Sequence, residues 1–485
     1  MRKMKKSIYG ILAGVAVLAA AGCNKFLNIK PKEFTIPEVV DDYQKLLNSQ
    51  DLYRAVSAYP VFLTDDVQAG QNTDVNTAAG FNTYPLFKRN LYSFEPGQVL
   101  EQGQNDQQWE TNYSHIFTFN AIINNVMDAK NGSEADKRRI KAEAQVGRAF
   151  EYLTLVNLYA KHYDAATASK DLGVPMILTE DLNKPYERVS VADVYAQIKK
   201  DLDEATPNLA DRVPNNFHPS KSVGLAFLSR MYLYMGDYQN ALKNANEALK
   251  LNAPLIDYKI YTTKDGTFGR VCTLADSTSF PDVQKNQEAV WVRLGTSSYG
   301  TVYTEVYATD DLIASYKRDL PPGSEDYRYK LFYCENQAKF GSTVIKFPGR
   351  SIWASYVDAN VGLSIPEIIL TAAECEARVG DKNKAMALIN KLRDARISNN
   401  QALVAANGEA ALRIVLDERR REMAFVGSNR LVDLKRLNKD PRFAKSVTHK
   451  TDDQTYTLPA NDNRYILPVP PRVLSMNPGI PQYER

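Results

Sequence analysis

The chain has 485 residues, and its 60 Lys and Arg against 57 Asp and Glu give a formal net charge of +3. Four of the basic residues lie in the first six positions, so the rest of the chain carries 56 basic against 57 acidic residues, a net charge of −1. Proteins that bind nucleic acid normally show a basic excess or a basic patch. No basic excess remains, which argues against nucleic acid as a partner.

The N-terminus, MRKMKKSIYGILAGVAVLAAAG, has the layout of a secretory signal peptide. Its basic start precedes an uncharged run of 16 residues, from Ser7 to Gly22, which ends in small side chains. A membrane-spanning helix needs about 20 apolar residues, so a transmembrane anchor is the weaker alternative. We expect residues 1–22 to be removed and residues 23–485 to form the mature domain.

Cys23 directly follows the small residues of the segment LAAAGC. This segment resembles the lipobox of bacterial lipoproteins, in which the cysteine receives a diacylglycerol and, after cleavage, an acyl chain on its amine. One acyl chain holds a protein only marginally on a bilayer, whereas two or three hold it stably. We therefore expect Cys23 to be a lipid anchor, and the alternative is a secreted protein with a chance cysteine.

Motifs for metal binding and catalysis are missing from the sequence. Cys272, Cys334 and Cys375 are scattered, none lies in a CxxC pair, and the four histidines form no HExxH motif. There is also no GxSxG elbow, no P-loop and no GxGxxG after a strand. We expect no catalytic residue, no metal site and no cofactor besides the lipid on Cys23, although a structural calcium ion is left open. The pattern favours a binding protein over an enzyme.

Helical periodicity dominates the chain. In the segment AQVGRAFEYLTLVNLYA (144–160), apolar residues recur at the three- and four-residue steps of one helix face. Similar patterns run through residues 106–129, 190–206, 220–251, 365–396 and 409–438. The sequence therefore predicts a mostly α-helical protein.

Two helical segments share the layout of a tetratricopeptide repeat, a pair of helices with a period of 34 residues. Residues 222–254 turn at Gly236-Asp237 and carry small alanines on the second helix, and residues 366–397 turn at Gly380-Asp381. A third pair would join 141–160 to 190–206, and a fourth pair, 412–437, would turn at Gly427. We expect a tetratricopeptide-like scaffold with its helices within residues 106–254 and 365–438.

Segments of another kind interrupt these repeats. Residues 65–105, 161–189 and 255–364 are expected to be irregular insertions, with short strands such as 288–294 and 342–347. In helical repeat proteins such insertions often contact the ligand or partner. The expected fold is thus a helical scaffold beside a less regular ligand-binding region of loops and a few short strands.

An arginine run, Arg419–Arg421, lies within the last repeat, flanked by acidic residues. Asp417 and Arg421 are four residues apart, a spacing that pairs side chains on a helix surface. We expect this run to form a solvated helix face with a bridge to a neighbouring helix.

Several segments in order resemble the SusD/RagB family, the outer-membrane nutrient-binding lipoproteins of gut and oral bacteria. They are the lipobox with CNKFLNIKP, the helix GRAFEYLTLVNLYA followed by LGVPMIL, the repeats, DERRREMAFVGSNRLVDLKRL and the terminal ILPVPPRVLSMNPGIPQ. The chain departs from the family at 426–431, where the family often has Glu-Gly-x-Arg followed by an aromatic residue.

The resemblance implies four tetratricopeptide-like units packed against a ligand-binding region. It also implies a lipid-anchored protein on the outer face of the outer membrane, which acts as a lid on a TonB-dependent transporter of the SusC type. The lid would bind an oligosaccharide or a peptide and pass it inward without catalysing a reaction. The alternative is a tetratricopeptide-repeat adaptor lipoprotein that binds a protein partner.

A sugar ligand would need exposed aromatic rings to stack on. The candidates share a position in the predicted insertions, and they are Tyr84, Phe87, Tyr92, Tyr299, Tyr303, Tyr307 and Trp353. For the aromatics at 84–92 and for the tyrosines at 299–307, the alternative is that they pack within the fold. Trp353 lies in a polar loop, where exposure is more plausible. Trp109, Tyr113 and Trp291 are expected in the core.

Overall fold

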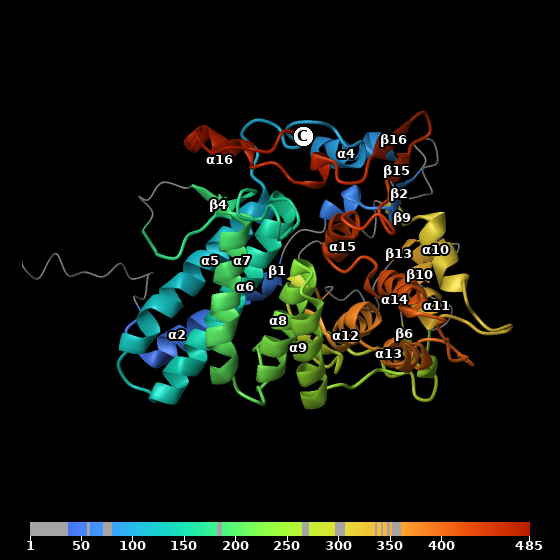
Figure 1. Ribbon diagram of the computed structural model, residues 1–485, viewed down its shortest axis with the longest axis horizontal. Coiled ribbons are helices and arrows are strands. Elements are labelled where there is room, and N and C mark those ends of the chain that lie inside the picture. Colours follow the sequence, from blue (N-terminus) through green and yellow to red (C-terminus); the bar gives the residue numbers. More distant parts are fainter. Residues whose placement is uncertain are drawn as a thin grey trace, which may run out of the picture.

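The computed structural model describes residues 37–55, 59–70, 80–181, 187–263, 271–295, 306–334, 337–340, 343–346, 350–351 and 360–485. The expected signal peptide and the expected lipid anchor Cys23 lie outside the described residues. The mostly α-helical fold class is confirmed (Figure 1). None of the described helices is long and apolar enough to cross a membrane.

Fifteen α-helices are described, and they vary from one turn to seven turns in length. In chain order they are α2 (Val40–Leu47), α3 (Gln50–Tyr53), α4 (Leu86–Tyr92), α5 (Gln107–Asn125), α6 (Glu134–Tyr159), α7 (Val191–Ala205), α8 (Lys221–Met235), α9 (Tyr238–Leu251), α10 (Asp310–Lys317), α11 (Tyr327–Phe332), α12 (Ile365–Val379), α13 (Lys382–Asp394), α14 (Gly408–Met423), α15 (Asn429–Leu437) and α16 (Pro471–Met476). The long ones fall within the two expected helical ranges.

The long helices pack in a row that begins with α5 and α6 and continues through α7, α8 and α9 to α12, α13 and α14 (Figure 1). Helices α9 and α12 pack together although more than a hundred residues separate them in the chain. The insertion between them therefore leaves the row and returns to it. Helices α6 and α7 also pack as the expected third pair across residues 161–189.

Local sequence explains where these helices begin and end. Gly236 closes α8 in the left-handed conformation with φ 76°, which costs glycine little. The Asp237 side chain then accepts from the backbone of Asn240 and caps α9. Ser190 and Asp193 form a capping box at the start of α7. The expected turn at Gly236-Asp237 is thus confirmed.

The strands are short, and each described strand pairs with one other strand. They are β1 (Arg54–Ala55), β2 (Val67–Ala69), β3 (Leu172–Pro175), β4 (Arg188–Ser190), β5 (Tyr261–Thr263), β6 (Val271–Thr273), β7 (Ala289–Trp291), β8 (Leu294–Gly295), β9 (Val306–Ala308), β10 (Tyr333–Cys334), β11 (Gln337–Phe340), β12 (Thr343–Lys346), β13 (Arg350–Ser351), β14 (Leu363–Ser364), β15 (Val447–Lys450) and β16 (Thr455–Leu458). Strands β7 and β12 confirm the two strands expected from sequence.

A second layer, residues 80–105 and 444–485, lies along one side of the helical row, at the top of Figure 1, and is named here the cover layer. It contains α4, the β15–β16 hairpin and α16 (Figure 1). Hydrogen bonds tie its C-terminal part to the third helix pair and to the insertion within it: the Leu467 backbone donates to the Leu158 carbonyl of α6 at 2.8 Å, and the Tyr483 hydroxyl donates to the Leu172 carbonyl of β3 at 2.7 Å. The C-terminal segment is thus fastened to the scaffold.

The expected fourth helix pair differs from the others. Helix α14 packs on α12 and α13, whereas α15 turns toward the cover layer and contacts the 3₁₀ helix Tyr59–Leu63. The turn is at Gly427, whose φ of +54° lies in the left-handed region. A Cβ at this position would also come within 2.9 Å of Val361 Cγ1. Asn438, which follows the last residue of α15, accepts from the Lys445 backbone at 3.0 Å and from Asn461 Nδ2 at 2.8 Å, so α15 joins the scaffold to the cover layer.

Candidate functional site

The arginine run on α14 is buried, so the expectation of a solvated face is wrong. Arg419 and Arg421 are 1 % and 2 % exposed. Arg419 Nε donates to Asp433 at 2.8 Å, and Arg421 Nη2 donates to Glu418 at 2.7 Å. The face is covered because neighbouring helices pack on more than one side of α14. The bridge to a neighbouring helix is confirmed, since Asp433 belongs to α15.

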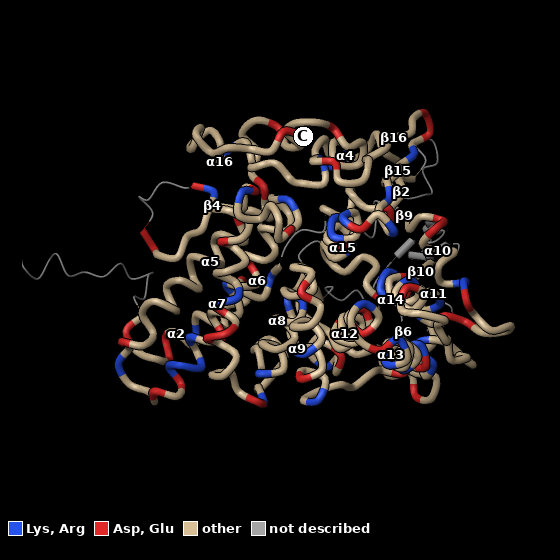
Figure 2. Tube along the Cα trace, viewed as in Figure 1, with Lys and Arg blue, Asp and Glu red and all other residues tan. Residues whose placement is uncertain are grey.

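The expected pair of Asp417 with Arg421 does not form. Asp417 accepts instead from Arg318 at 3.2 Å, at the surface. Arg421 pairs instead with Glu418, on the inner side of the helix. The same carboxylate also pairs with Arg328 and Arg393. Burial raises the pKa of Glu418, but these guanidinium groups outweigh it and hold the pKa well below its usual range. Figure 2 shows basic and acidic residues interleaved around α13 and α14.

Two further arginines connect α14 and α15 to the segment before β2. Arg420 Nε donates to Asp66 at 2.8 Å, and Arg430 donates to both carboxylate oxygens of Asp65 at 2.7 Å. Burial raises the pKa of Asp65, but Arg430 and the other nearby cations lower it well below the usual value. These ion pairs hold residues 59–70 against the scaffold.

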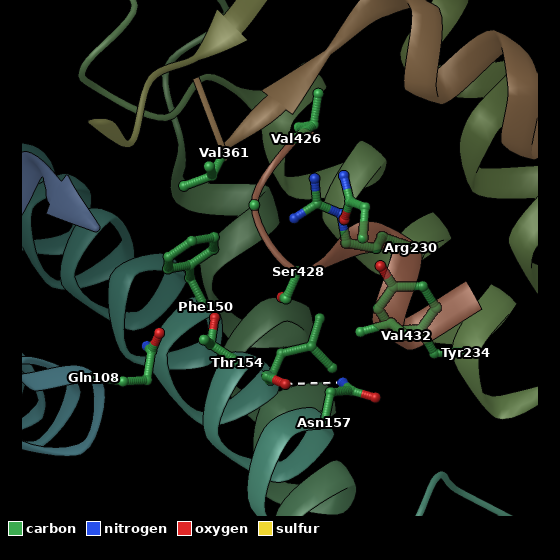
Figure 3. A pocket seen from close by; sticks show the side chains of 13 residues that line it. Gln108, Phe150, Thr154, Asn157, Arg230, Tyr234, Val361, Val426, Ser428 and Val432 are labelled. Atoms are coloured by element: carbon green, nitrogen blue, oxygen red, sulfur yellow. Dashed lines mark hydrogen bonds between the residues drawn. The ribbon is translucent and has the colours of Figure 1, made fainter. Parts of the chain in front are cut away.

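Beside this junction lies a cavity of about 60 Å³, which we name the central pocket (Figure 3). Its wall combines residues of α5, α6, α8 and α15 with the loop that carries Gly427. The lining residues are Gln108, Phe150, Leu153, Thr154, Asn157, Arg230, Tyr234, Val361, Val426, Gly427, Ser428, Asn429 and Val432. The segment that departs from the SusD/RagB pattern thus forms part of this wall.

Some polar groups of the central pocket are already bound to the protein. Arg230 donates to Glu367 at 2.7 and 2.5 Å and also to the Gly362 carbonyl. Asn157 Nδ2 donates to the Leu153 carbonyl at 2.8 Å, the bond drawn in Figure 3. Gln108 Oε1 has no hydrogen-bond partner among the described residues. Thr154, Tyr234, Ser428 and Asn429 also present polar side chains to the pocket, so it offers a ligand several polar groups.

The size of the central pocket limits what it can hold. Its volume of about 60 Å³ is far below the about 300–1,000 Å³ usual for ligand pockets. In Figure 3 Phe150 and Thr154 lie on one side of the pocket and Arg230 and Tyr234 on the other. In this form the central pocket suits a single hydroxyl-sized group and not a whole sugar ring.

Two of the predicted ligand-binding aromatics, Tyr84 and Tyr92, are buried in the cover layer. Tyr84 is 3 % exposed and packs edge-on against Phe62, and Tyr92 stacks on His449 with ring centroids 4.2 Å apart. The Tyr92 hydroxyl accepts from the Ala69 backbone at 3.0 Å and donates to the Lys450 carbonyl at 2.8 Å. Their burial favours the alternative that they anchor the cover layer.

The other predicted aromatics are divided between buried and undescribed positions. Phe87 is half-buried and packs edge-on against Tyr59, and Tyr307 is buried on β9. Tyr299, Tyr303 and Trp353 lie outside the described residues. The role of all seven in binding stays a prediction.

The aromatics expected in the core are placed largely as predicted. Trp109 and Trp291 are buried. Tyr113 is half-buried, packs on Trp109 with ring centroids 5.0 Å apart and donates to the Pro175 carbonyl at 2.8 Å. The described residues contain no group of three or more His, Cys, Asp or Glu placed to hold a metal ion.

Two family models match this chain, one at each end. Residues 25–233 match a model described as starch-binding and associating with the outer membrane, and residues 365–484 match the model of the SusD family. The chain belongs to the SusD/RagB family. No curated protein matches it in sequence.

Solved structures of the same superfamily share the fold. A SusD superfamily protein from Bacteroides fragilis has a TM-score of 0.69 at 18 % identity, covering 92 % of this chain and 100 % of its own. A SusD superfamily protein from Bacteroides thetaiotaomicron has a TM-score of 0.67 at 21 % identity, and the match covers 92 % of this chain and 100 % of that chain. A SusD-like carbohydrate binding protein from Bacteroides vulgatus has a TM-score of 0.65 at 19 % identity, and the match covers 91 % of this chain and 97 % of that chain.

Proposed function

We propose that this SusD-like protein captures an oligosaccharide at the cell surface and passes it to a TonB-dependent transporter of the SusC type. The match of residues 25–233 to a model described by starch binding and the outer membrane carries the proposal. A solved structure of similar fold is described as a carbohydrate binding protein, which supports a sugar over a peptide ligand. We assign no catalytic residue.

The lipid on Cys23 would hold the protein at the outer membrane, facing the cell exterior. Two or three acyl chains are enough to hold a protein stably on a bilayer. Cys23→Ala should release the protein from the membrane fraction and abolish labelling by radioactive palmitate. Labelling that persists in this variant would contradict the lipoprotein assignment.

Binding without turnover is tested with the mature chain, residues 23–485, on a glycan array and in affinity electrophoresis. We expect retention by at least one class of oligosaccharide, with no shortening of the bound chains. Tyr299→Ala, Tyr303→Ala or Trp353→Ala should weaken that binding by roughly 1–3 kcal/mol at unchanged circular dichroism. The buried Tyr84→Ala provides the contrast, because its effect should follow loss of folding.

The transporter is tested by extraction in mild detergent. A large β-barrel partner should co-purify with the wild-type protein. If no glycan or peptide binds and only soluble proteins co-purify, the result would favour the adaptor alternative over a nutrient-binding protein.

A further inference from the structure

A second cavity, of about 250 Å³, lies where the C-terminal end of α6 meets α15 and the loop before Ile466. Pockets for drug-sized ligands usually measure about 300–1,000 Å³, and this cavity lies just below that range, which suits a smaller molecule such as one sugar residue. It shares no lining residue with the central pocket. We name it the α15 cavity.

Three buried polar atoms on the wall of the α15 cavity have no hydrogen-bond partner among the described residues. They are His162 Nδ1, Asn438 Nδ2 and the Tyr465 hydroxyl. These residues are 6 %, 3 % and 2 % exposed. Buried polar side chains in folded proteins are ordinarily hydrogen-bonded, so three such atoms at one cavity point to a group that binds there.

The surroundings decide which of these atoms donate and which accept. Asn438 Oδ1 accepts from the Lys445 backbone at 3.0 Å, which leaves Nδ2 as a donor. Burial raises the pKa of Tyr465 to about 12, so its hydroxyl keeps its proton. A side-chain interaction with Asn438 acts against burial and lowers that pKa, but neither Asn438 Nδ2 nor the Tyr465 hydroxyl makes a hydrogen bond of ordinary distance and angle. Both atoms therefore remain available to a third group.

His162 supplies an acceptor. Burial, and then the charge of Lys435, lowers its pKa to about 3, while the Tyr234 carbonyl acts in the opposite direction. At this pKa the ring is neutral at physiological pH, with one N–H and one lone pair. Because Nδ1 has no partner, we assign the proton to Nε2 and the free lone pair to Nδ1.

Lys435 adds a buried cation. Its Nζ donates to the carbonyls of Asn157 and Ala160 at the end of α6, which uses two of its three donors. Burial and, after it, Lys439 lower its pKa to about 7. The lining acid Asp462 is paired with Arg464. The cavity thus combines free donors and a cation with no free carboxylate among its described residues, so an acceptor-rich anion fits it best.

We propose that the α15 cavity binds a uronic acid residue. The carboxylate accepts from Lys435 Nζ, Asn438 Nδ2 and the Tyr465 hydroxyl, and a ring hydroxyl donates to His162 Nδ1. The choice of a sugar as the carrier of the carboxylate rests on the proposed function. The carboxylate itself follows from the four groups of the cavity.

Calorimetry with residues 23–485 and glucuronate tests this assignment. Glucose is the matched ligand, because it carries a hydroxymethyl group in place of the carboxylate. Glucuronate should bind at least about tenfold more tightly than glucose, as charge-assisted hydrogen bonds are the stronger ones. No heat with glucuronate, which is the result for a cavity filled by water, or equal affinity for both sugars would overturn the proposal.

Two variants locate the binding. Tyr465→Phe removes only a hydroxyl without a partner and should weaken glucuronate binding about tenfold while leaving the melting temperature unchanged. Asn438→Asp keeps the acceptor for Lys445 but opposes the carboxylate, so affinity should fall by about 100-fold or more. Tyr456→Phe, in the β15–β16 hairpin, is the control and should bind like the wild type. Binding that is unchanged in both cavity variants would contradict the site.

Further binding measurements distinguish this proposal from the proposed function. A tripeptide with a free C-terminal carboxylate should bind more weakly than glucuronate, and tighter binding of the peptide would overturn the assignment to a sugar. Retention of neutral glycans with no uronate binding would refute only the α15 cavity. Uronate binding without retention of any oligosaccharide would refute only the proposed function.

Discussion

The α8–α9 pair and the α14–α15 region are built from different chemistry, although both were expected to be helix pairs of one kind. Helices α8 and α9 approach through Ala241, Ala245 and Ala248, all fully buried, and the Ser229 hydroxyl donates to the Ala241 carbonyl at 2.9 Å. Helices α14 and α15 are held by buried ion pairs such as Arg419 with Asp433. The alanine contacts between α8 and α9 depend only on complementary shape. The buried ion pairs between α14 and α15 stabilise the fold only when both charged partners are present.

The largest effect should come from removing an acid of the α14 network. Glu418→Gln leaves the guanidinium groups of Arg393 and Arg421 without that carboxylate in the interior. Breaking a buried pair costs about 3–5 kcal/mol, because the remaining charge is left uncompensated. Chemical denaturation should show this loss of unfolding free energy.

Glu409→Gln is the matched control on the same helix. Glu409 pairs with Arg413 at 2.9 Å, but both side chains are about half exposed. A surface pair of this kind contributes at most about 0.5 kcal/mol. If both variants lose the same stability, the network on α14 is not the source of the difference between the two regions.

The apolar side of the comparison is tested by Ala245→Leu. Ala245 is fully buried between α8 and α9, so a larger side chain must separate the helices. Overpacking of a core costs about 1–3 kcal/mol. Thermal unfolding should show the loss, and a fully stable variant would mean that this interface is loosely packed.

The helices could be predicted from the sequence because the signals for helix formation are local. The spacing in 144–160 and the Gly236-Asp237 turn depend on residues within a few positions of one another. The burial of Arg419 and Arg421 could not be predicted, because their environment comes from partners such as Asp433 and from helices distant in the chain. A charged run beside acidic residues looks the same on a solvated face and in a buried network.

The candidate sites were harder to predict for the same reason. The central pocket takes its wall from four helices and a loop, and only the departure at 426–431 gave a signal in the sequence. Tyr84 and Tyr92 were selected as aromatics in a polar insertion, a pattern that suits anchoring as well as binding. The unpartnered atoms of His162 and Tyr465 depend on what lies within a few ångström in space.

The junction between the scaffold and the cover layer should respond to pH through His162. Burial lowers its pKa to about 3, compared with 6.5 when unfolded. The unfolded chain therefore takes up the proton first, and stability falls as the pH drops from 6.5 toward 3. At about 1.4 kcal/mol per pH unit, the loss at pH 5 is about 2 kcal/mol.

Denaturation at pH 7.5 and pH 5.0 measures this effect. His162→Phe keeps a ring beside Tyr234 and removes the titrating group, so the difference between the two pH values should shrink by about 2 kcal/mol. Other groups titrate in both proteins and cancel in this comparison. An identical pH dependence in the variant would show that His162 does not carry the penalty.

The smallest effect is expected from Tyr92→Phe in the cover layer. The ring and its stacking on His449 remain, and only the hydroxyl that joins Ala69 to Lys450 is lost. Leaving these two backbone groups without a partner costs about 1–2 kcal/mol. Stability should fall by that amount while glycan affinity stays unchanged, because the hydroxyl anchors β2 to β15. Weaker binding at unchanged stability would instead place Tyr92 in the ligand site and show that the cover layer opens to admit the ligand.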